Sequence, residues 1–370
     1  MMRRSMKIAS VATVAGAVAA AVALTGGAAT GQQDTRSGGA VNDAFASAAA
    51  EYDVPRDLVV AVGYGETHLD GHAGKPSQDN GFGVMHLVSN PARHTLEQAA
   101  AITKVPATRL RTDTAANIRG GAAVLRALAD QQGLDAAARD RLGAWYPVVA
   151  AYGGATDDRV AKMYANTVYG LLAAGVEAKS GGEQVRVAEQ AVTPEPGRFA
   201  NVRALDDVAG DVHALDYPNS IWNPASTANY STGRTSAITT VVIHVTQGSY
   251  AGTISWFQNP DAQVSAHYVV RSADGEITHM VADADTAWHA RSGNPYAIGI
   301  EHEGFIDDPS WFTDAMYRSS AALTSWLCDT YGIPKDRTGI VGHSEVPGND
   351  HTDPGPNWNW DYYIQLVNGG

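Results

Sequence analysis

The chain has 370 residues, of which 44% are hydrophobic and 18% charged, and its formal net charge is −13. This length and composition fit two or more folded domains and exclude an intrinsically disordered chain. The acidic balance would repel nucleic-acid phosphates and argues against nucleic acid as the main partner. The single cysteine, Cys328, excludes an internal disulfide framework, and its helix-like surroundings predict a small core residue.

Residues 1–32 are predicted to be a secretion signal. Arg3, Arg4 and Lys7 form a positive start, and an apolar run rich in Ala and Val follows, with small residues after it. The alternative is a membrane anchor, but the run is short and no Lys/Arg cluster follows it. We therefore expect cleavage near the end of this segment, a secreted or cell-wall location, and no stable membrane insertion of the mature chain.

Residues 40–176 are predicted to be almost entirely helical. Apolar positions recur at helical spacing through the first thirty residues of this stretch, and Val54-Pro55 is predicted to begin a second helix there, because Pro suits a first turn. Further helices are predicted over Ala115–Gln131 and Asp157–Gly175. Over residues 177–215 the periodicity is lost and prolines occur, so this stretch is predicted to be a linker.

Residues 216–370 alternate between strand and helix patterns and predict an α/β domain. One helix is predicted over Thr313–Tyr331, because this segment has an apolar stripe and Gly332 directly follows it. The predicted strands are Ile238–Val245, His267–Val270, Ile277–Val281, Ala297–Glu303 and Ile340–Gly342, with a hairpin turn at Ala273-Asp274-Gly275 and the helix over Thr313–Tyr331.

Two histidines and an aspartate leave these predicted elements at separate places. His244 ends an apolar strand, His343 follows a short strand, and Asp353 lies in the loop that continues from it, GHSEVPGNDHTDPGP. Two histidines and a carboxylate fit a zinc site that keeps a fourth position open for water. The alternatives are histidines that are hydrogen-bonded for structural reasons and an aspartate that only makes a turn.

Several segments of this domain resemble the zinc-dependent N-acetylmuramoyl-L-alanine amidases of type 2, which are related to the peptidoglycan recognition proteins. The matching segments, in order, are VVIHVT, VSAHYVV with a following DG hairpin, TAWHA, NPYAIGIEHEG and GHSEVPGNDHTDPGP. The resemblance covers about residues 216–367. It implies a central mixed β-sheet flanked by helices, with His244, His343 and Asp353 as the ligands of Zn²⁺.

The resemblance also implies the groups that carry out the chemistry. Strand alternation places Glu301 and Glu303 on the same face, so that either could face the metal, and the resemblance favours Glu301 as the acidic residue at the catalytic water. The alternative is a surface strand that bears acidic residues. His351 stands where many members have a lysine; a protonated His351 would stabilise an oxyanion, and less so as pH rises through its pKa. Ala266 stands where some members have a tyrosine.

The predicted function is that of an exported peptidoglycan hydrolase. It would cleave the amide between the lactyl group of N-acetylmuramic acid and the L-alanine of the stem peptide. One alternative is a recognition module that binds muropeptides without cutting them, and a second is a metallohydrolase that acts on a different amide. The sequence indicates no oligomeric state.

The helical domain has a resemblance of its own, to the lysozyme-like fold of soluble lytic transglycosylases. The matching segments are VPRDLVVAVGYGETHLDGH, DNGFGVMHLV, NIRGGAAVLRALA and VVAAYGG. Glu66 matches the catalytic glutamate of that family, and burial at the end of an apolar helix would raise its pKa, as a general acid needs. Thr67, His86 and Gly153 depart from the family's pattern. Glycan cleavage, glycan binding without cleavage and a helical spacer all remain open.

Overall fold

The computed structural model describes residues 39–203, which we call the helical region, and residues 216–370, which we call the sheet region. The predicted signal segment 1–32 and residues 204–215 of the predicted linker lie outside the described residues. The two regions belong to one compact unit. Within the described ranges, no helix combines the length and the apolarity that crossing a membrane requires.

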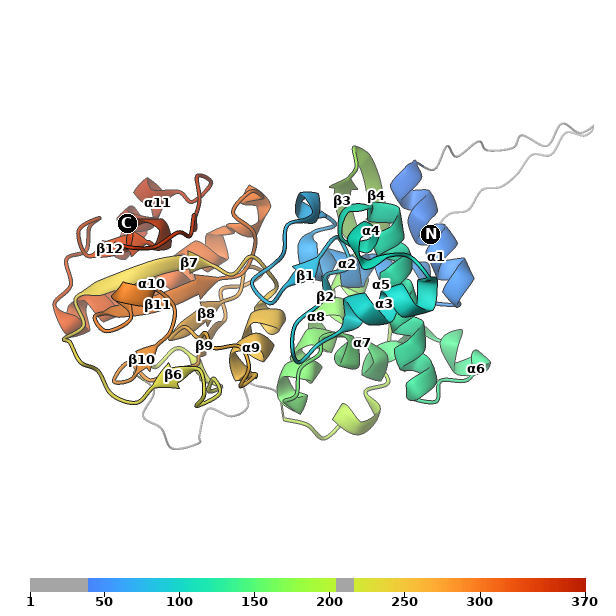
Figure 1. Cartoon of the computed structure of the whole chain (residues 1–370), viewed down its shortest axis with the longest axis horizontal. Helices are drawn as coiled ribbons and strands as arrows, with labels where there is room; N and C mark the ends of the chain where they lie inside the picture. The colour runs from blue at the N-terminus through green and yellow to red at the C-terminus, as the bar shows by residue number, and fades with distance from the viewer. Residues whose placement is uncertain (1–38, 204–215) are drawn as a thin grey trace, which may run out of the picture. The chain divides into compact units, whose positions relative to one another are not determined.

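The helical region follows the predicted pattern and adds shorter helices to it (Figure 1). The predicted break at Pro55 is confirmed, because one helix ends at Tyr52 and the next begins directly after the proline. The longest helix of the region starts after Asp113, whose side chain accepts a hydrogen bond from the Ala116 N–H. The helices are α1 (Ala40–Tyr52), α2 (Arg56–Thr67), α3 (Thr95–Thr103), α4 (Ala107–Thr112), α5 (Thr114–Gln131), α6 (Ala136–Arg139), α7 (Tyr146–Tyr152) and α8 (Asp158–Ala174), and the short strands β1 (Gly81–Phe82) and β2 (Leu87–Val88) pair in an antiparallel hairpin.

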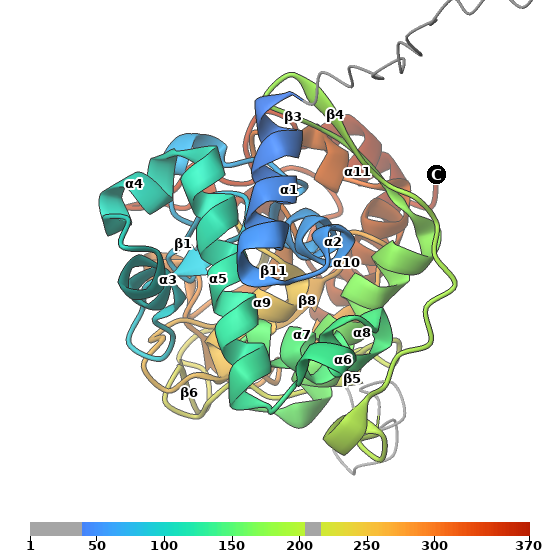
Figure 2. The ribbon, with the colours of Figure 1, turned by 90° about the vertical axis from the view of Figure 1, so that its right-hand side faces the viewer.

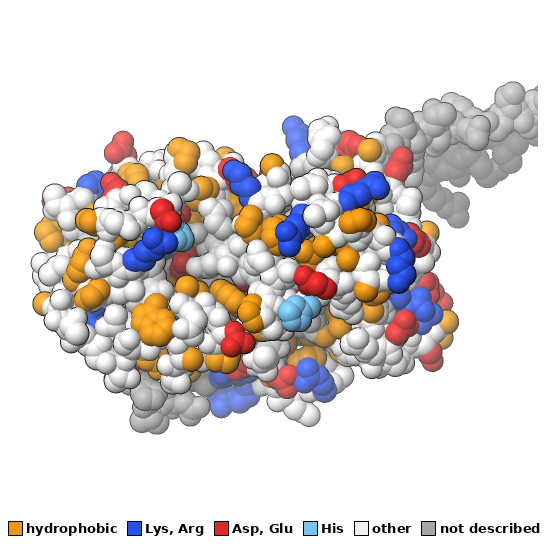
Figure 3. Space-filling view, viewed as in Figure 1, with side chains coloured by type: hydrophobic (Ala, Val, Ile, Leu, Met, Phe, Trp, Pro, Cys, Tyr) orange, Lys and Arg blue, Asp and Glu red, His pale blue; other side chains and the backbone are white. Residues whose placement is uncertain are grey.

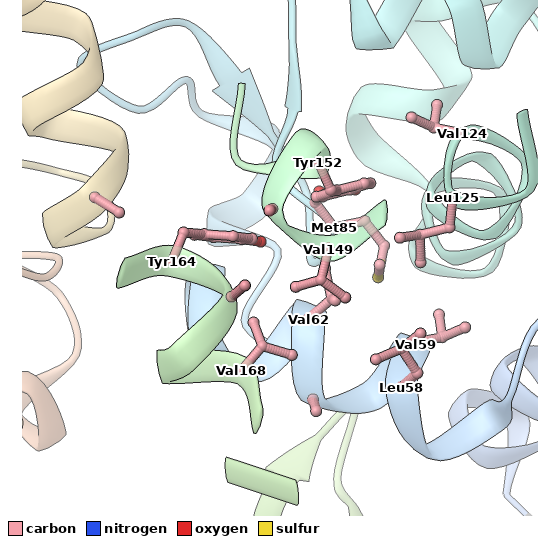
Figure 4. Close-up of a cluster of buried hydrophobic side chains, with 14 of the residues drawn as sticks. Leu58, Val59, Val62, Met85, Val124, Leu125, Val149, Tyr152, Tyr164 and Val168 are labelled. Carbon is pink, nitrogen blue, oxygen red and sulfur yellow. The ribbon is translucent and has the colours of Figure 1, made fainter. Parts of the chain in front are cut away.

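Apolar side chains of α2, α5, α7 and α8 meet in the core of this region (Figure 4). Val62, Val149 and Val168 come from three different helices and are fully buried there. Met85, from the turn between β1 and β2, inserts among them (Figure 4). Gly121 permits this approach, because a Cβ at that position would lie 2.6 Å from the Met85 side chain. The β1–β2 turn is therefore fixed by the core.

The predicted linker begins too early in the sequence, because residues 176–187 form a hairpin. Strands β3 (Val176–Ser180) and β4 (Glu183–Val187) pair antiparallel across Gly181-Gly182, whose φ angles of 57° and 81° suit a tight hairpin turn. The Glu183 carboxylate accepts a hydrogen bond from the Val41 N–H, which caps the N-terminal end of α1. Figures 1 and 2 show the hairpin beside this helix. The hairpin is thus part of the helical region.

The sheet region contains a mixed sheet of six strands, in the order β12-β7-β11-β8-β9-β5. The predicted strands are confirmed with small shifts at their ends, and the predicted hairpin joins β8 and β9. Strands β12, β7, β11 and β8 are parallel neighbours. The elements are β5 (Ile221–Trp222), β6 (Tyr230–Ser231), β7 (Thr240–Val245), α9 (Tyr250–Gln258), β8 (Tyr268–Val270), β9 (Ile277–His279), β10 (Thr286–Ala287), β11 (Ala297–His302), α10 (Asp314–Tyr331), β12 (Ile340–Gly342) and α11 (Trp360–Val367).

Side chains alternate between the two faces of the sheet. Ile298 and Ile300 of β11 pack in one cluster with α10 and α11, and His302 on the same face hydrogen-bonds the Ser320 hydroxyl of α10 at 2.6 Å. The predicted alternation along β11 is therefore confirmed, and Glu301 and Glu303 belong to the opposite face. Helix α9 contacts β8 and, from the helical region, α8.

The helical region packs against the sheet region on the side of α9. Ile254 and Phe257 of α9 belong to the same buried cluster as the core of the helical region. His68 stacks on Trp311 with ring centroids 3.6 Å apart, and His72 stacks on Phe305 at the same separation. The two regions therefore share a continuous core, which brings the β1–β2 end of the helical region close to β11.

Candidate active site and metal centre

The carboxyl ends of three adjacent parallel strands carry the candidate site. His244 lies at the end of β7, and its register partner on β11 is Glu301. His343 follows β12 directly. Because parallel strands end at the same edge of a sheet, three side chains from distant parts of the sequence meet there.

Asp353 joins the two histidines. Its Oδ2 lies 3.3 Å from His244 Nδ1, and its Oδ1 lies 3.1 Å from His343 Nδ1. Potential ligand atoms of the three residues all lie within 4.8 Å of one another. Two imidazole nitrogens and one carboxylate oxygen on a single centre form a donor set that suits zinc and leaves a fourth position open.

The ionisation states of this group also fit a metal. Burial lowers the pKa of His244 to about 4, so the ring is neutral and has a free lone pair near neutral pH. Burial opposes ionisation of Asp353, but its contacts with His244 and His343 hold the pKa of its carboxyl well below the usual range. A neutral imidazole and an ionised carboxylate are the forms that bind a metal cation.

The second ring nitrogen of His244 is also held. His244 Nε2 lies 2.9 Å from His289 Nδ1, in a hydrogen bond between the two rings. Such a partner fixes the tautomer and the orientation of a metal-binding histidine, and leaves Nδ1 directed at Asp353.

Glu301 faces a cavity of about 880 Å³ that opens beside this centre. His343, His351 and Asp353 line the same cavity, and Figure 3 shows a histidine with acidic and basic side chains around a hollow on its left-hand side. Burial, together with the negative charge of Asp353, raises the pKa of Glu301 well above its ordinary value. A carboxyl group in this state can both take up and return a proton.

Glu303 does not compete for this role. Its two carboxylate oxygens accept hydrogen bonds from the Tyr250 and Ser272 N–H groups, each at 2.8 Å. It is therefore committed to holding the start of α9 and the turn after β8, whereas Glu301 lines the cavity.

His351 lies at the entrance of the cavity. Its ring stacks on that of His343 with centroids 4.3 Å apart, and its Nδ1 lies 3.7 Å from Asp353 Oδ1. Burial and the neighbouring His343 lower its pKa. The ring is thus positioned to donate a hydrogen bond from neutral imidazole, rather than to provide the permanent charge that a lysine would give.

Comparison with known proteins identifies the family. The family model described as N-acetylmuramoyl-L-alanine amidase matches residues 234–356. N-acetylmuramoyl-L-alanine amidase A of Achromobacter lyticus is 45% identical over 176 residues, which cover 42% of this chain and 98% of the relative. The chain belongs to the N-acetylmuramoyl-L-alanine amidase family.

A second relative agrees with this assignment of the family. The 1,6-anhydro-N-acetylmuramyl-L-alanine amidase AmpD of Haemophilus influenzae is 40% identical over 114 residues, covering 28% of this chain and 59% of the relative. A crystal structure of a Se-Met AmpD derivative has 26% identity and a TM-score of 0.36, and the match covers 42% of this chain and 99% of that chain.

In the helical region of the amidase, Glu66 occupies a buried ion-pair network. Its side chain is only 1% exposed; it lies 3.2 Å from His86 Nδ1 and accepts hydrogen bonds from the hydroxyls of Tyr164 and, in the sheet region, Ser249. Burial opposes its ionisation, but His86, Arg93 and the Tyr164 hydroxyl together outweigh burial and lower its pKa. The predicted rise in its pKa is therefore wrong, and its carboxylate is buried within this network.

Sequence reasoning missed two residues at the site of the amidase. His289 lies in the quoted TAWHA segment, so its motif was visible but its contact with His244 was not. Gln78, from the helical region, donates a hydrogen bond to Glu301 at 3.3 Å across 223 residues of sequence. No local signal in the sequence links that pair.

A second group of possible ligands in the amidase, Asp216, His279 and Asp283, is already engaged within the protein. The Asp283 carboxylate oxygens each accept a hydrogen bond from a tyrosine hydroxyl, that of Tyr268 or Tyr331, at 2.9 Å. The Asp216 carboxylate accepts the Asp283 N–H at 2.8 Å. These oxygens serve the fold rather than a metal.

Proposed function

We propose that this amidase is a zinc enzyme that hydrolyses the amide between the lactyl group of N-acetylmuramic acid and the L-alanine of the stem peptide. The observation that carries the proposal is the meeting of His244, His343 and Asp353 beside Glu301 in one open cavity. Membership of the family supports peptidoglycan as the substrate.

In this proposal the three ligands hold the zinc ion, which when bound would supply a Lewis acid that polarises the scissile carbonyl and acidifies water. Glu301 takes a proton from the attacking water, whose oxygen forms the new bond to the carbonyl carbon. The C–N bond then breaks, and Glu301 returns the proton to the L-alanine nitrogen. The products are a free lactyl carboxyl group and a stem peptide with a free amino terminus.

We propose that His351 stabilises the negative charge that develops on the carbonyl oxygen. Its ring lies at the cavity wall, and 53% of its side chain is exposed, so a substrate can reach it. A neutral imidazole N–H can donate a hydrogen bond to that oxygen, which stabilises the transition state more than the ground state.

The rival function is muropeptide binding without cleavage. The complete set of three ligands and the carboxyl group that faces the cavity favour the enzyme, because binding alone requires neither. Mass spectrometry of peptidoglycan digested with the zinc-loaded protein separates the two. Stem peptides that begin with free L-alanine support the amidase; binding with no released peptide would show a recognition module, and cleavage elsewhere in the stem would show a different hydrolase.

We also propose that the chain is exported. The support is the positive start and the apolar run within residues 1–32. The mass of the protein recovered from the culture fluid and the cell wall tests this. A mature chain without that segment is expected, and a full-length chain found only inside the cell would contradict export.

A further inference from the structure

A loop of the helical region forms part of the amidase cavity. This loop, residues 75–80, follows the contacts that dock the helical region and contributes Pro76 and Gln78 to the cavity lining. Gln78 Nε2 donates a hydrogen bond to Glu301 Oε1 at 3.3 Å. The other oxygen, Glu301 Oε2, is buried and has no hydrogen-bond partner in the part of the chain that the structure describes.

Buried polar groups hold the loop in place. The Ser77 hydroxyl lies 2.6 Å from Asp79 Oδ1 and 2.8 Å from His86 Nε2, and it accepts the Gly81 N–H at 2.7 Å. His86 also lies 3.0 Å from Asp79 and, at its other nitrogen, 3.2 Å from Glu66. These groups fix the residues on both sides of Gln78, whose own side chain is exposed in the cavity.

Two contacts with the sheet region hold this network and the loop near Glu301. The Ser249 hydroxyl donates to Glu66 Oε2 at 3.0 Å. On the other side of the loop, His72 stacks on Phe305, which lies only four residues beyond Glu301. The loop is thus anchored to both regions, and Gln78 is held at a fixed place relative to Glu301.

We propose that Gln78 is a positioning residue of the amidase, which holds one oxygen of the Glu301 carboxyl group so that the other faces the reacting water. The proposal rests on the function assigned to Glu301 above. An amide N–H suits this role, because it is neutral and can donate to the glutamate oxygen before and after proton transfer. The helical region would then be a working part of the active site and not a separate module.

The loop that carries Gln78 lies outside the part of the chain that the family model matches. The Achromobacter lyticus relative is matched over 98% of its own length by less than half of this chain, and the family match begins at residue 234. The hydrogen bond between Gln78 and Glu301 therefore joins the part of the chain that matches the family model to a loop outside it.

The test compares three forms of the zinc-loaded full chain: wild type, Gln78→Met, and Gln131→Ala as a control. Met has nearly the length of Gln but donates no hydrogen bond, and Gln131 is an exposed glutamine at the end of α5. We expect kcat of Gln78→Met to fall about tenfold, the scale of one hydrogen bond to a charged group. We also expect KM within about twofold of wild type, since the ground-state contacts remain. Zinc content and thermal midpoint should match wild type, and Gln131→Ala should match it throughout.

A Gln78→Met enzyme with wild-type kcat would overturn the proposal. So would a raised KM at unchanged kcat, because Gln78 would then contact substrate rather than position Glu301. Gln78→Glu adds a repelling carboxylate and should lose more activity than Gln78→Met. Glu301→Gln, measured alongside, distinguishes failure of the proposed function from failure of the role of Gln78. If Glu301→Gln is active, the proposed function fails. If Glu301→Gln is inactive while Gln78→Met equals wild type, only the role of Gln78 fails.

Discussion

Asp353 is central to the candidate metal centre, because it is the only anion among the three proposed ligands and contacts both of the others. Asp353→Ala removes one ligand and the charge that offsets a divalent cation. We expect the purified variant to contain less than about a tenth of the wild-type zinc by elemental analysis, because a two-histidine site binds zinc weakly. Asp350→Ala, an exposed neighbour on the same loop, should keep its zinc. Equal zinc in Asp353→Ala and wild type would remove Asp353 from the centre.

The buried His86 predicts a dependence of stability on pH. Burial alone would lower the pKa of His86, but the carboxylates of Asp79 and Glu66 raise it to about 10 from an ordinary value of 6.5. The folded protein therefore keeps a proton that the unfolded chain releases above pH 6.5. The stabilisation is fully present below pH 6.5 and is lost as pH rises toward 10.

Denaturant unfolding of wild type and His86→Gln from pH 7 to 8.5 measures this effect. The difference between their free energies of unfolding should shrink by about 1.4 kcal/mol per pH unit, the value for one proton. His86→Gln itself should be less stable at pH 7 by about 3–5 kcal/mol, because two buried carboxylates lose their partner. Parallel curves for the two proteins would show that His86 is not protonated in the fold.

At the residue scale, the sequence predicted the three residues of the candidate metal site but not the groups that orient them. His244, His343 and Asp353 lie in motifs whose order and spacing indicate their chemistry. The partners of His244 and Glu301 are His289 and Gln78, and these contacts depend on how the chain packs. The predicted rise in the pKa of a buried glutamate was wrong for Glu66, because burial was considered without its neighbour His86.

At the scale of elements, strand β11 must carry a glycine beside the candidate metal centre. A Cβ at Gly299 would lie 2.5 Å from His289 Nδ1, the atom that hydrogen-bonds His244. Gly299→Ala should displace the His289 ring and weaken zinc binding about 10–100-fold, the usual cost of losing such a partner. Competition with a zinc chelator measures the affinity.

The matched control is Gly170→Ala, on an exposed face of α8 where an added Cβ meets no atom within 4 Å. This change should leave zinc affinity unchanged and stabilise the fold by about 0.5–1 kcal/mol, because alanine favours a helix over glycine. Wild-type zinc affinity in Gly299→Ala would mean that the contact between His289 and His244 does not support the metal.

Regular patterns made the long elements predictable. Helix α10 has a clear apolar stripe and capping residues at both ends, Thr313 and Gly332, and it lies where the sequence places it. The hairpin at residues 176–187 was missed because the prolines and the loss of helical period further along suggested a linker, although Gly181-Gly182 between two alternating segments is a hairpin signal. Short strands such as β5 and β6 have too few residues to show a period.

At the scale of the whole molecule, the continuous core predicts that the two regions unfold together. Buried side chains of α9 and of the helical region belong to one cluster, so loss of either region exposes apolar surface of the other. Seven of the eight tryptophans lie in the sheet region, Trp145 being the exception. Tryptophan fluorescence therefore reports mainly the sheet region, and far-ultraviolet circular dichroism reports mainly the helices.

We expect the two signals to follow one denaturant curve in the zinc-loaded protein, with the same midpoint and slope. Two separate transitions would contradict a shared core. The sequence predicted two domains joined by a linker and could not predict this docking, because stacking pairs such as His72 and Phe305 join distant parts of the chain and leave no local pattern. The resemblance of the helical region to lytic transglycosylases remains a prediction.

In the proposed mechanism, Glu301 performs proton transfer beside a zinc centre made by His244, His343 and Asp353. The most direct measurement is the release of stem peptides from peptidoglycan by zinc-loaded Glu301→Gln, compared with wild type at equal zinc content. Glutamine keeps the shape of the side chain but cannot accept the proton, so release should fall by at least about a hundredfold while zinc stays bound. Release at the wild-type rate would contradict the account.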